Sequence, residues 1–453
     1  MTEAAARTKA DEAGRFRRVV PGSWLEALAV YRRPRLLAIL FMGFSSGLPL
    51  ALTAATLSLR LADLGVSLTE IGLFTLVRFS YSFKFLWSPL IDRLPIPFVT
   101  ARLGRRRSWA LAIQTALAAA ILVLGTIDPR DSPWWTALAA TIVAFLSASQ
   151  DIVIDAYRIE LLAPEEQGAG AAATQWGYRF GMVASGAGAL YAASFGGWSL
   201  AYGLMAALML VGMVTVWLTP EPEASRAVEP IPGANALERL RSWLGRAVVA
   251  PFADLVRRNG GIWLVLILLF IVLYKFGEAI AGTMSNPLYL SLGFTKIEIA
   301  TVAKIYGVAA TLAGVAIGGV LVLRLGIFGA LFVSGALQML SNLMYMLQVW
   351  VGHDVPMLAL TIGTENLTGG MASAAFVAYL SGLCNVAFTA TQYALLSSLA
   401  TMGVNVLSAS GGFLAEQLGW TPFFLVSTAM CLPGLMLLLW IMRRSAGLAP
   451  AQP

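Results

Sequence analysis

Long apolar segments, separated by short polar stretches, follow one another along most of the chain. Each is about 20 residues long, the length that an α-helix needs to cross the hydrocarbon core of a bilayer. The segments begin near Leu36, Glu70, Ser108, Trp134, Glu165, Trp198, Gly261, Thr295, Phe328, Val355, Asn385 and Thr421. Uninterrupted runs of this length favour helices over membrane-spanning β-strands, which need only about ten residues. The pattern therefore predicts an all-α integral membrane protein with twelve transmembrane helices.

The largest polar gap, residues 219–260, separates the sixth apolar segment from the seventh. It starts with the Pro- and Glu-rich stretch "TPEPEASRAVEPIPG" and continues with "ALERLRSWLGRAVVAPFADLVRR". In the second stretch, one face of a helix carries Leu237, Leu240, Leu244 and Val248. Arginines flank that face, so we expect an amphipathic helix at the lipid headgroups. The expected domains are an N-terminal segment (1–35), a six-helix half (36–218), the linker (219–260), a second six-helix half (261–444) and a tail (445–453).

The two predicted halves share short matching sequences. The stretch "LADLGVSLTEIG" (61–72) resembles "YLSLGFTKIEIA" (289–300), and "AATQW" (172–176) resembles "TATQY" (389–393). Both matches lie at corresponding helices of a six-plus-six plan. Such a duplicated plan is typical of transporters whose two halves move around a central site, so we expect two pseudo-symmetric halves.

Composition and charge fit this interpretation and add an orientation. Hydrophobic residues make up 58% of the chain and charged residues 12%, about half the charged share of a soluble domain. Of the 31 Lys and Arg, 22 lie on the side of the termini and linker, three lie on the other side, and six lie inside helices. By the positive-inside rule, both termini are cytoplasmic. The net charge of +7 is then largely a topology signal, and nucleic acid is not an expected partner.

Cysteine and histidine usage excludes several kinds of site. The two cysteines, Cys384 and Cys431, belong to separate apolar segments, which gives neither a disulfide framework nor a metal motif. The single histidine, His353, stands in a polar loop, where it is expected to be solvated. We therefore expect no metal and no cofactor.

The fourth apolar segment carries charged residues, in "SQDIVIDAYRIELL" (149–162). Spacings of four and three place Asp151, Asp155 and Arg158 on one helix face near the middle of the membrane. A charge at that depth costs roughly 3 kcal/mol, so this face is expected to meet protein or a water-filled cavity. Two interpretations remain open: a structural ion pair between Asp155 and Arg158, or a face that lines a route for substrate and protons.

Further charges lie inside other apolar segments. Arg179, in "GYRFGMVASG", is expected to balance Asp151 or Asp155, and its guanidinium could also bind a substrate carboxylate through two parallel hydrogen bonds. The others are Arg78, Lys84, Lys275, Glu278, Lys304 and Glu365. Lys275 and Glu278 are three residues apart and could simply neutralise one another. Cations outnumber anions in this set, which favours an acidic substrate. The residues assigned to a substrate and proton pathway are Asp151, Asp155, Arg158, Arg179, Lys84, Lys275, Glu278, Glu365 and Gln392.

The polar hairpin after the second segment contains "WSPLIDRL" and "LGRRRSW". An Asp and an Arg followed by an arginine cluster resemble the signature loop of the major facilitator superfamily. In that family the Asp caps a neighbouring helix and the arginines help to latch the cytoplasmic gate. The alternative is that these arginines are topology charges only. The residues assigned to the gate are Asp92, Arg93, Gly104, Arg105, Arg106 and Arg107.

Taken together, the segments resemble the AmpG family of anhydromuropeptide permeases, which belongs to that superfamily. The matching stretches are "GFSSGLPLALT" (43–53), "YSFKFLWSPLIDR" (81–93), "GRRRSW" (104–109), "SASQDIVIDAYR" (147–158), "GYRFGMVASG" (177–186), "VLYKFGEA" (272–279), "ENLTGGM" (365–371) and "TATQYALLSSL" (389–399). The resemblance covers nearly all of the predicted helices. Some members continue with two further helices, whereas this chain stops at Pro453.

The resemblance implies a multi-pass protein of the bacterial inner membrane that is not an enzyme. It implies import of GlcNAc-1,6-anhydroMurNAc, with or without peptide, driven by protons, and hence a place in peptidoglycan recycling and, indirectly, in β-lactamase induction. The expected partners are this amino-sugar substrate, protons and membrane lipid, and the expected state is a monomer.

Three other functions were weighed. Siderophore-uptake permeases look similar in the same hairpin, and acetyl-CoA carriers are more distantly similar. A membrane prenyltransferase could use Asp151 and Asp155 as a metal site. Such enzymes need a second Asp-rich motif to hold Mg²⁺, and no other Asp pair occurs in a predicted helix.

Overall fold

The computed structural model describes residues 29–66, 74, 77, 79–223, 245–408 and 411–447. These residues form helices and connecting turns, with no β-strand among them. The part of the expected amphipathic helix that carries Leu237, Leu240 and Leu244 lies outside the described residues. Its continuation is helical, as a π-helix η7 (Gly245–Val249) followed by α14 (Ala250–Asn259).

The first half precedes the linker. Its helices are η1 (Val30–Arg32), α3 (Pro34–Leu52), α4 (Ala55–Asp63), α6 (Phe79–Phe83), η3 (Lys84–Leu86), α7 (Ser88–Arg93), α8 (Thr100–Leu103), α9 (Arg105–Thr126), α10 (Pro133–Leu161), η4 (Pro164–Glu166), α11 (Gln167–Val183), η5 (Ala184–Gly188) and α12 (Ala189–Leu218).

The second half follows α14. Its helices are α15 (Gly261–Tyr274), α16 (Phe276–Ser291), α17 (Lys296–Ile299), η8 (Ala300–Tyr306), α18 (Gly307–Val351), α19 (Val355–Leu383), η9 (Val386–Phe388), α20 (Thr389–Ser408), α21 (Gly411–Leu418), α22 (Trp420–Ala429) and α23 (Leu432–Gly447).

Several helices are long and apolar enough to cross a membrane. Within the described ranges there are seven, or eight if the pair Val355–Leu383 and Val386–Val404, bent by 95°, counts as one span. Two of the seven run for 55 and 51 residues, more than twice the length that a bilayer core of about 30 Å requires. Inside these two the backbone leaves the helical conformation at Gly197 (φ 77°) and Gly326 (φ 73°), so each contains more than one crossing. The all-helical membrane fold is confirmed, and the number twelve stays a prediction.

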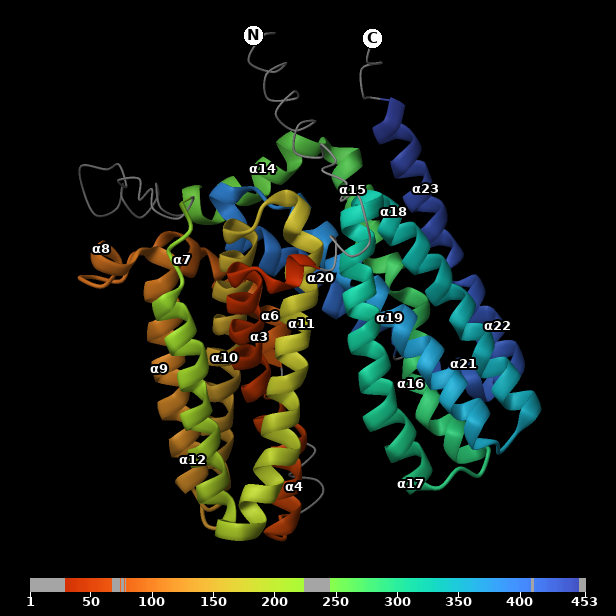
Figure 1. Ribbon diagram of the computed structural model, residues 1–453, viewed down its shortest axis with the longest axis horizontal. Coiled ribbons are helices and arrows are strands. Elements are labelled where there is room, and N and C mark those ends of the chain that lie inside the picture. The colour runs from red at the N-terminus through yellow and green to blue at the C-terminus, as the bar shows by residue number, and fades with distance from the viewer. Residues whose placement is uncertain are drawn as a thin grey trace.

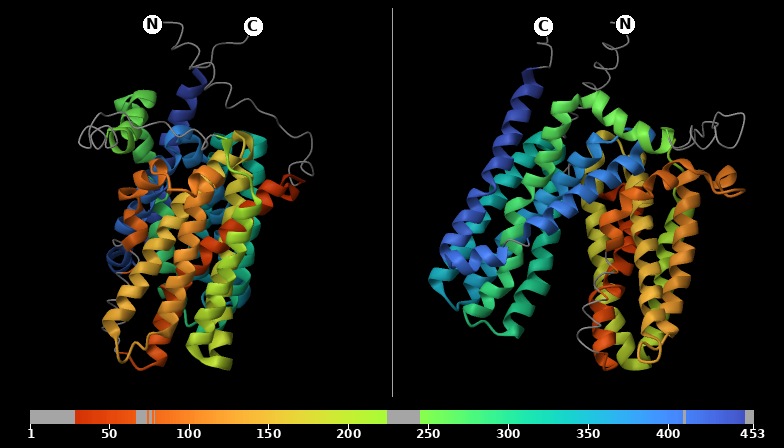
Figure 2. Two further views of the ribbon diagram at one scale, coloured as in Figure 1. Left: turned by 90° about the vertical axis from the view of Figure 1, so that its left-hand side faces the viewer. Right: turned by 180° about the vertical axis from the view of Figure 1, so that it is seen from behind.

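The helices form two bundles that meet at one end (Figure 1). Helix α14 and the C-terminal end of α23 lie at this end, which we call the linker end. Toward the opposite end the two bundles diverge, as the view from behind also shows (Figure 2). The linker end is therefore where side chains of the two halves come into contact.

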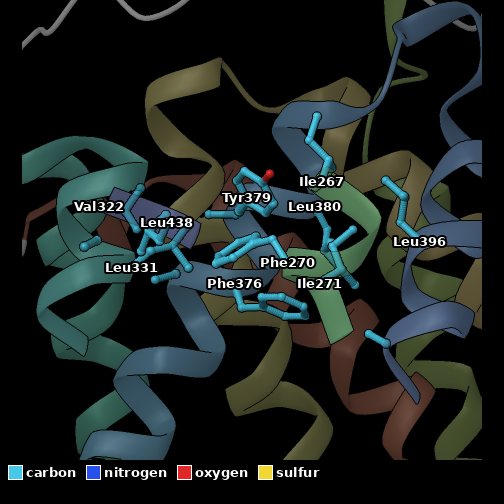
Figure 3. Packing of buried hydrophobic residues seen from close by; sticks show 14 of the residues in the cluster. Ile267, Phe270, Ile271, Val322, Leu331, Phe376, Tyr379, Leu380, Leu396 and Leu438 are labelled. Carbon is cyan, nitrogen blue, oxygen red and sulfur yellow. The ribbon is translucent and has the colours of Figure 1, made fainter. Parts of the chain in front are cut away.

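Each half has its own apolar core. In the second half, Phe270 packs edge-on against Tyr379 at 5.3 Å between ring centroids, and Leu331, Leu438 and Phe376 complete this cluster (Figure 3). Side-chain packing of this kind holds each bundle together as a unit. The contacts between the halves, described next, include both apolar and polar side chains.

Glycines allow close helix packing inside the first half. A side chain at Gly43 or Gly47 of α3 would collide with the backbone carbonyl of Thr174 or Tyr178 of α11. This explains the spacing of the two glycines, which lets helix backbones approach each other in membranes. The contact positions α11 so that its other face is turned toward the second half.

Candidate functional site

A buried ion-pair cluster holds the linker end of the first half. Arg106, at the start of α9, donates from Nη2 to Asp92 Oδ1 (2.7 Å) and to Glu160 Oε1 (2.6 Å). The side chains of Arg106 and Glu160 are fully buried, and that of Asp92 is 1% exposed. The cluster joins α7, α9 and α10. Asp92 and Arg106, which the sequence placed in the same hairpin, are thus in direct contact. Glu160 is a third residue of this ion-pair cluster.

The first residues of the linker bind the same region. The carboxylate of Glu221 accepts hydrogen bonds from the backbone amides of Arg106 (2.7 Å) and Arg107 (3.0 Å). An acidic group is favourable there, because the first amides of a helix lack partners and carry positive partial charge. Gly104 makes this approach possible: its φ is +88°, and a side chain on it would collide with Glu221. Glu221 had no assigned role from the sequence, although an acidic residue just after the last apolar segment of a half was a usable signal.

The remaining basic residues of the hairpin have separate contacts. Arg107 donates from Nη2 to the carbonyl of Trp217 (2.6 Å), which ties α9 to the end of α12. Arg105 is buried beside the ion-pair cluster, and the electrostatic interactions of its side chain include Arg106 and Asp92. The hairpin is therefore a packed polar structure, which topology charges alone would not explain.

Two contacts at the hairpin cross from one half to the other. Asp92 Oδ2 accepts hydrogen bonds from the backbone amide (3.1 Å) and the hydroxyl (2.9 Å) of Thr391, at the start of α20. The guanidinium of Arg93 stacks on the ring of Phe388 at 4.7 Å. Asp92 thus caps a helix of the second half while it binds Arg106 in the first. Its carboxylate connects the two halves at the linker end.

Asp155 of α10 lies between two cations. Its carboxylate is 3.8 Å from Lys84 Nζ and 3.6 Å from Arg158 Nη2, and its side chain is 19% exposed. Arg158 is fully buried and extends to the second half, where Nη1 donates to Ser381 Oγ (3.1 Å) and the guanidinium stacks on Tyr393 (5.4 Å). Asp155 and Arg158 therefore form the expected ion pair, and Arg158 also bridges the halves. Any change in the charge of Asp155 acts directly on that bridge.

Asp151 lies one turn away from Asp155 on the same helix, and its side chain is half-buried. Its electrostatic neighbours are Lys84, Asp155 and the hydroxyl of Ser46. Lys84 is itself buried, pairs with Asp155 and is also an electrostatic neighbour of Asp151. Both aspartates thus share one lysine. Arg179 was expected in this role, but it makes no ion pair with either aspartate.

Arg179 instead occupies the face of α11 that points to the second half. Gly168, Ala172, Trp176 and Arg179 recur at helical spacing on this face. The first two pack against Gly319 of α18, and Trp176 Nε1 donates to the carbonyl of Leu312 (2.8 Å). Arg179 lies one turn further along α11, away from the linker end and toward the region where the halves diverge. Its side chain is exposed. Its guanidinium is thus available to a ligand between the halves.

The second half carries charges at comparable positions. Lys275, between α15 and α16, pairs with Glu278 at 2.6 Å and lies over the ring of Phe376 at 5.6 Å. Glu365 of α19 is half-buried, and its Oε2 accepts from Asn366 Nδ2 (3.2 Å). Lys275 and Glu278 do neutralise one another, as their spacing suggested. The side chain of Glu278 remains 36% exposed.

Gln392 lies apart from these charges. It is fully buried, and its Nε2 donates to Asp254 Oδ2 (2.9 Å) and to the carbonyl of Pro251 (3.0 Å), both in α14. Its Oε1 accepts from the backbone amide of Asn385 (2.7 Å). The Nε2 end of the amide therefore attaches the linker helix to the second half. The assignment of Gln392 to the pathway stays a prediction, and in the structure its amide binds α14 and the backbone of Asn385.

The described part of the chain contains no group of three or more His, Cys, Asp or Glu side chains placed to hold a metal ion. Asp151 and Asp155 have a lysine and an arginine as neighbours, a surrounding that suits bound anions better than bound cations. The arrangement fits ion pairing.

Comparison with known proteins points to one family. The family model described as Major Facilitator Superfamily matches residues 37–364. The Anhydromuropeptide permease of Escherichia coli (strain K12) is 43% identical over 414 residues, 91% of this chain and 80% of that protein. The Putative transporter AmpG 4 of Rickettsia conorii is 35% identical over 417 residues, 91% of this chain and 97% of that protein.

Two solved structures have a similar fold. The human organic anion transporter MFSD10 (TETRAN) superposes with a TM-score of 0.60 at 16% identity and covers 92% of this chain and 100% of that one. A bacterial homologue of the iron transporter ferroportin, in an outward-facing state, also has a TM-score of 0.60, at 18% identity, with 90% and 98% of the two chains covered. At such low identity these structures support the fold alone.

Proposed function

The chain belongs to the major facilitator superfamily, as an AmpG-type permease, and we propose that it imports anhydromuropeptides together with protons. The cargo is GlcNAc-1,6-anhydroMurNAc, with or without its peptide, which enters from the periplasm for peptidoglycan recycling and indirectly influences β-lactamase induction. The observation that carries this proposal is the 43% identity, over 91% of the chain, to a protein named anhydromuropeptide permease.

The charge distribution between the halves supports an acidic cargo. The first half contributes three cations, Lys84, Arg158 and Arg179, and Asp155 pairs with the first two. The exposed guanidinium of Arg179 has the geometry to bind a carboxylate through two parallel hydrogen bonds. The sugar acid or a peptide carboxylate of an anhydromuropeptide supplies such a group.

We assign the linker end to the cytoplasm, because 22 of the 31 Lys and Arg lie on that side. The protein is then a monomer of the inner membrane that is closed toward the cytoplasm by Asp92, Arg106 and their partners. With the other ends of the halves apart, Arg179 and Asp155 are reached from the periplasm. This is the state that receives cargo before the halves rock to the opposite arrangement.

Uptake into proteoliposomes tests the function. We expect labelled anhydromuropeptide to accumulate when a pH gradient, acidic on the side opposite the linker, is imposed, and to equilibrate without accumulation when the gradient is absent. A ferric siderophore serves as the competing cargo, since a similar hairpin occurs in siderophore permeases. Accumulation of the siderophore and not of the anhydromuropeptide would replace the proposed substrate.

Arg179→Gln is expected to reduce uptake of the carboxylate-bearing cargo to the level of empty liposomes. The reason is the loss of a fork-shaped cation that faces the space between the halves. Arg179→Lys keeps the positive charge but lacks the planar guanidinium with its two parallel donors. Its uptake should therefore lie between that of Arg179→Gln and that of the wild type. Yield and melting temperature in detergent should stay near wild type for both variants. A fall in melting temperature would show that Arg179 has a packing role instead.

A further inference from the structure

The second half contains buried polar side chains that have no protein partner. In the part of α18 that follows Gly326, Ser334, Gln338 and Asn342 are each four residues apart and so lie on one face of the helix. They are 0%, 6% and 1% exposed. Neither the Nε2 nor the Oε1 of Gln338 has a hydrogen-bond partner among the described residues, and Ser334 Oγ and Asn342 Oδ1 also lack one.

The side chain of Gln338 lines a pocket inside the second half. The pocket lies between the helices α15, α16, α18, α19 and α23, and its walls include Tyr274, Glu278 and Cys431. The space inside it is small and suffices for about one water molecule. Gly335 brings the walls close, because a side chain there would be 2.9 Å from both Leu435 and Tyr274. The pocket is separate from Asp155 and Arg179, which lie in the first half.

A buried glutamine of the first half has a partner at one end of its amide. Gln114 of α9 is fully buried, and its Nε2 donates to Ser45 Oγ at 3.2 Å, while its Oε1 has no partner among the described residues. In the second half, no hydroxyl of the described residues is placed in this way for Gln338. An amide buried without hydrogen bonds costs several kcal/mol in an apolar medium. Two free hydrogen-bonding ends beside a pocket are therefore expected to bind something polar.

We propose that this pocket is a site for ordered water, with Gln338 as its main ligand, and that this water also contacts Glu278. Buried waters usually bind polar groups that lack protein partners, and each needs two to four such groups. Gln338 supplies a donor and an acceptor, and the Glu278 carboxylate supplies further acceptors. The water gives Glu278 a hydrogen-bond donor in addition to Lys275. The transport consequence of this contact rests on the function proposed above, whereas the existence of the site does not.

Hydroxyl-radical footprinting tests the site without substrate. Radiolysis of bound water oxidises the side chains that touch it, so in H₂¹⁸O we expect labelling of Cys431 and Tyr274. Cys384, which is buried in the apolar core and donates to Leu380 O, is the internal reference and should be labelled much less. In Gln338→Leu, labelling of Cys431 should fall several-fold toward that of Cys384. Gln114→Leu is the matched control, and in this variant the labelling of Cys431 should be the same as in the wild type.

Two results would overturn the proposal. One is equal labelling of Cys431 and Cys384 in the wild type. The other is labelling of Cys431 that persists in Gln338→Leu, since water would then reach the thiol by another route. If Gln338→Leu does not yield folded protein, Gln338→Asn, a shorter amide, replaces it, with partial loss of labelling expected.

Uptake measurements test whether Gln338 acts through Glu278, whose electrostatic neighbours are Lys275, Glu365, Tyr274 and Cys431. We expect Gln338→Leu to lower proton-driven accumulation in the wild-type background and to have no further effect in a Glu278→Gln background. Such non-additivity is the mark of two groups that act as a unit. Additive losses would mean that Gln338 is not a positioning residue for Glu278. If the wild type shows no uptake, the result counts against the proposed function. It does not bear on the water site, which the footprinting tests.

Discussion

Arg106→Leu is expected to destabilise the folded protein by roughly 3–5 kcal/mol, the cost of leaving buried charges without their partner. Arg106 is fully buried and binds Asp92 and Glu160 at 2.7 and 2.6 Å, so its removal leaves two buried carboxylates facing each other. Urea or thermal unfolding in detergent measures the loss. Arg102→Leu, at an exposed position of the same hairpin, is the control and should change the stability little.

A rescue separates the charge effect from packing. Adding Asp92→Asn and Glu160→Gln to Arg106→Leu removes the uncompensated charges, so most of the lost stability should return. If the triple variant is no more stable than Arg106→Leu, the guanidinium stabilises α9 by packing and not by pairing. Asp92→Asn also weakens the bonds to Thr391, so we expect the triple variant to open more readily at the linker end.

Asp155→Asn is expected to abolish accumulation against a gradient while substrate exchange continues. Asn keeps the volume and most of the hydrogen bonding of Asp but cannot take up a proton. Arg158 binds both Asp155 and Ser381 of the other half, so protonation of Asp155 changes the charge balance at a contact between the halves. For one proton per cargo, a pH gradient of one unit supports about tenfold accumulation. In the variant this ratio should fall to about one, with counterflow retained.

The control for this prediction is Asp128→Asn in the loop before α10. Hydrogen bonds from Arg130 lower the pKa of Asp128 to about 2. The carboxylate therefore stays ionised between about pH 5 and pH 8 and contributes no titration in that window. Its variant should accumulate cargo as the wild type does. If Asp155→Asn also accumulates cargo in response to the pH gradient, Asp155 is not the proton carrier, and Glu278 or Glu365 takes its place.

Much of the candidate site could be predicted residue by residue. The pairing of Asp155 with Arg158 follows from a spacing of three on one helix, and the pairing of Lys275 with Glu278 follows from the same rule. The hairpin residues of the ion-pair cluster could be named from the sequence, because the Asp and the arginines stand close together in the chain. Glu160 and Glu221 were not assigned to it, since each comes from a distant segment and meets Arg106 only through packing.

That the chain is a helical membrane protein follows from its amino-acid sequence, because apolar length and helical period are local properties. The same holds for which apolar segments carry charged residues. The partners of these residues emerge only from the folded chain: Lys84, and not Arg179, lies beside Asp155, and Gln392 anchors the linker helix. The contact of Asp92 with Thr391 spans 299 positions in the chain. Contacts at such separations depend on how each helix is rotated and packed against the others, and no local pattern encodes that rotation.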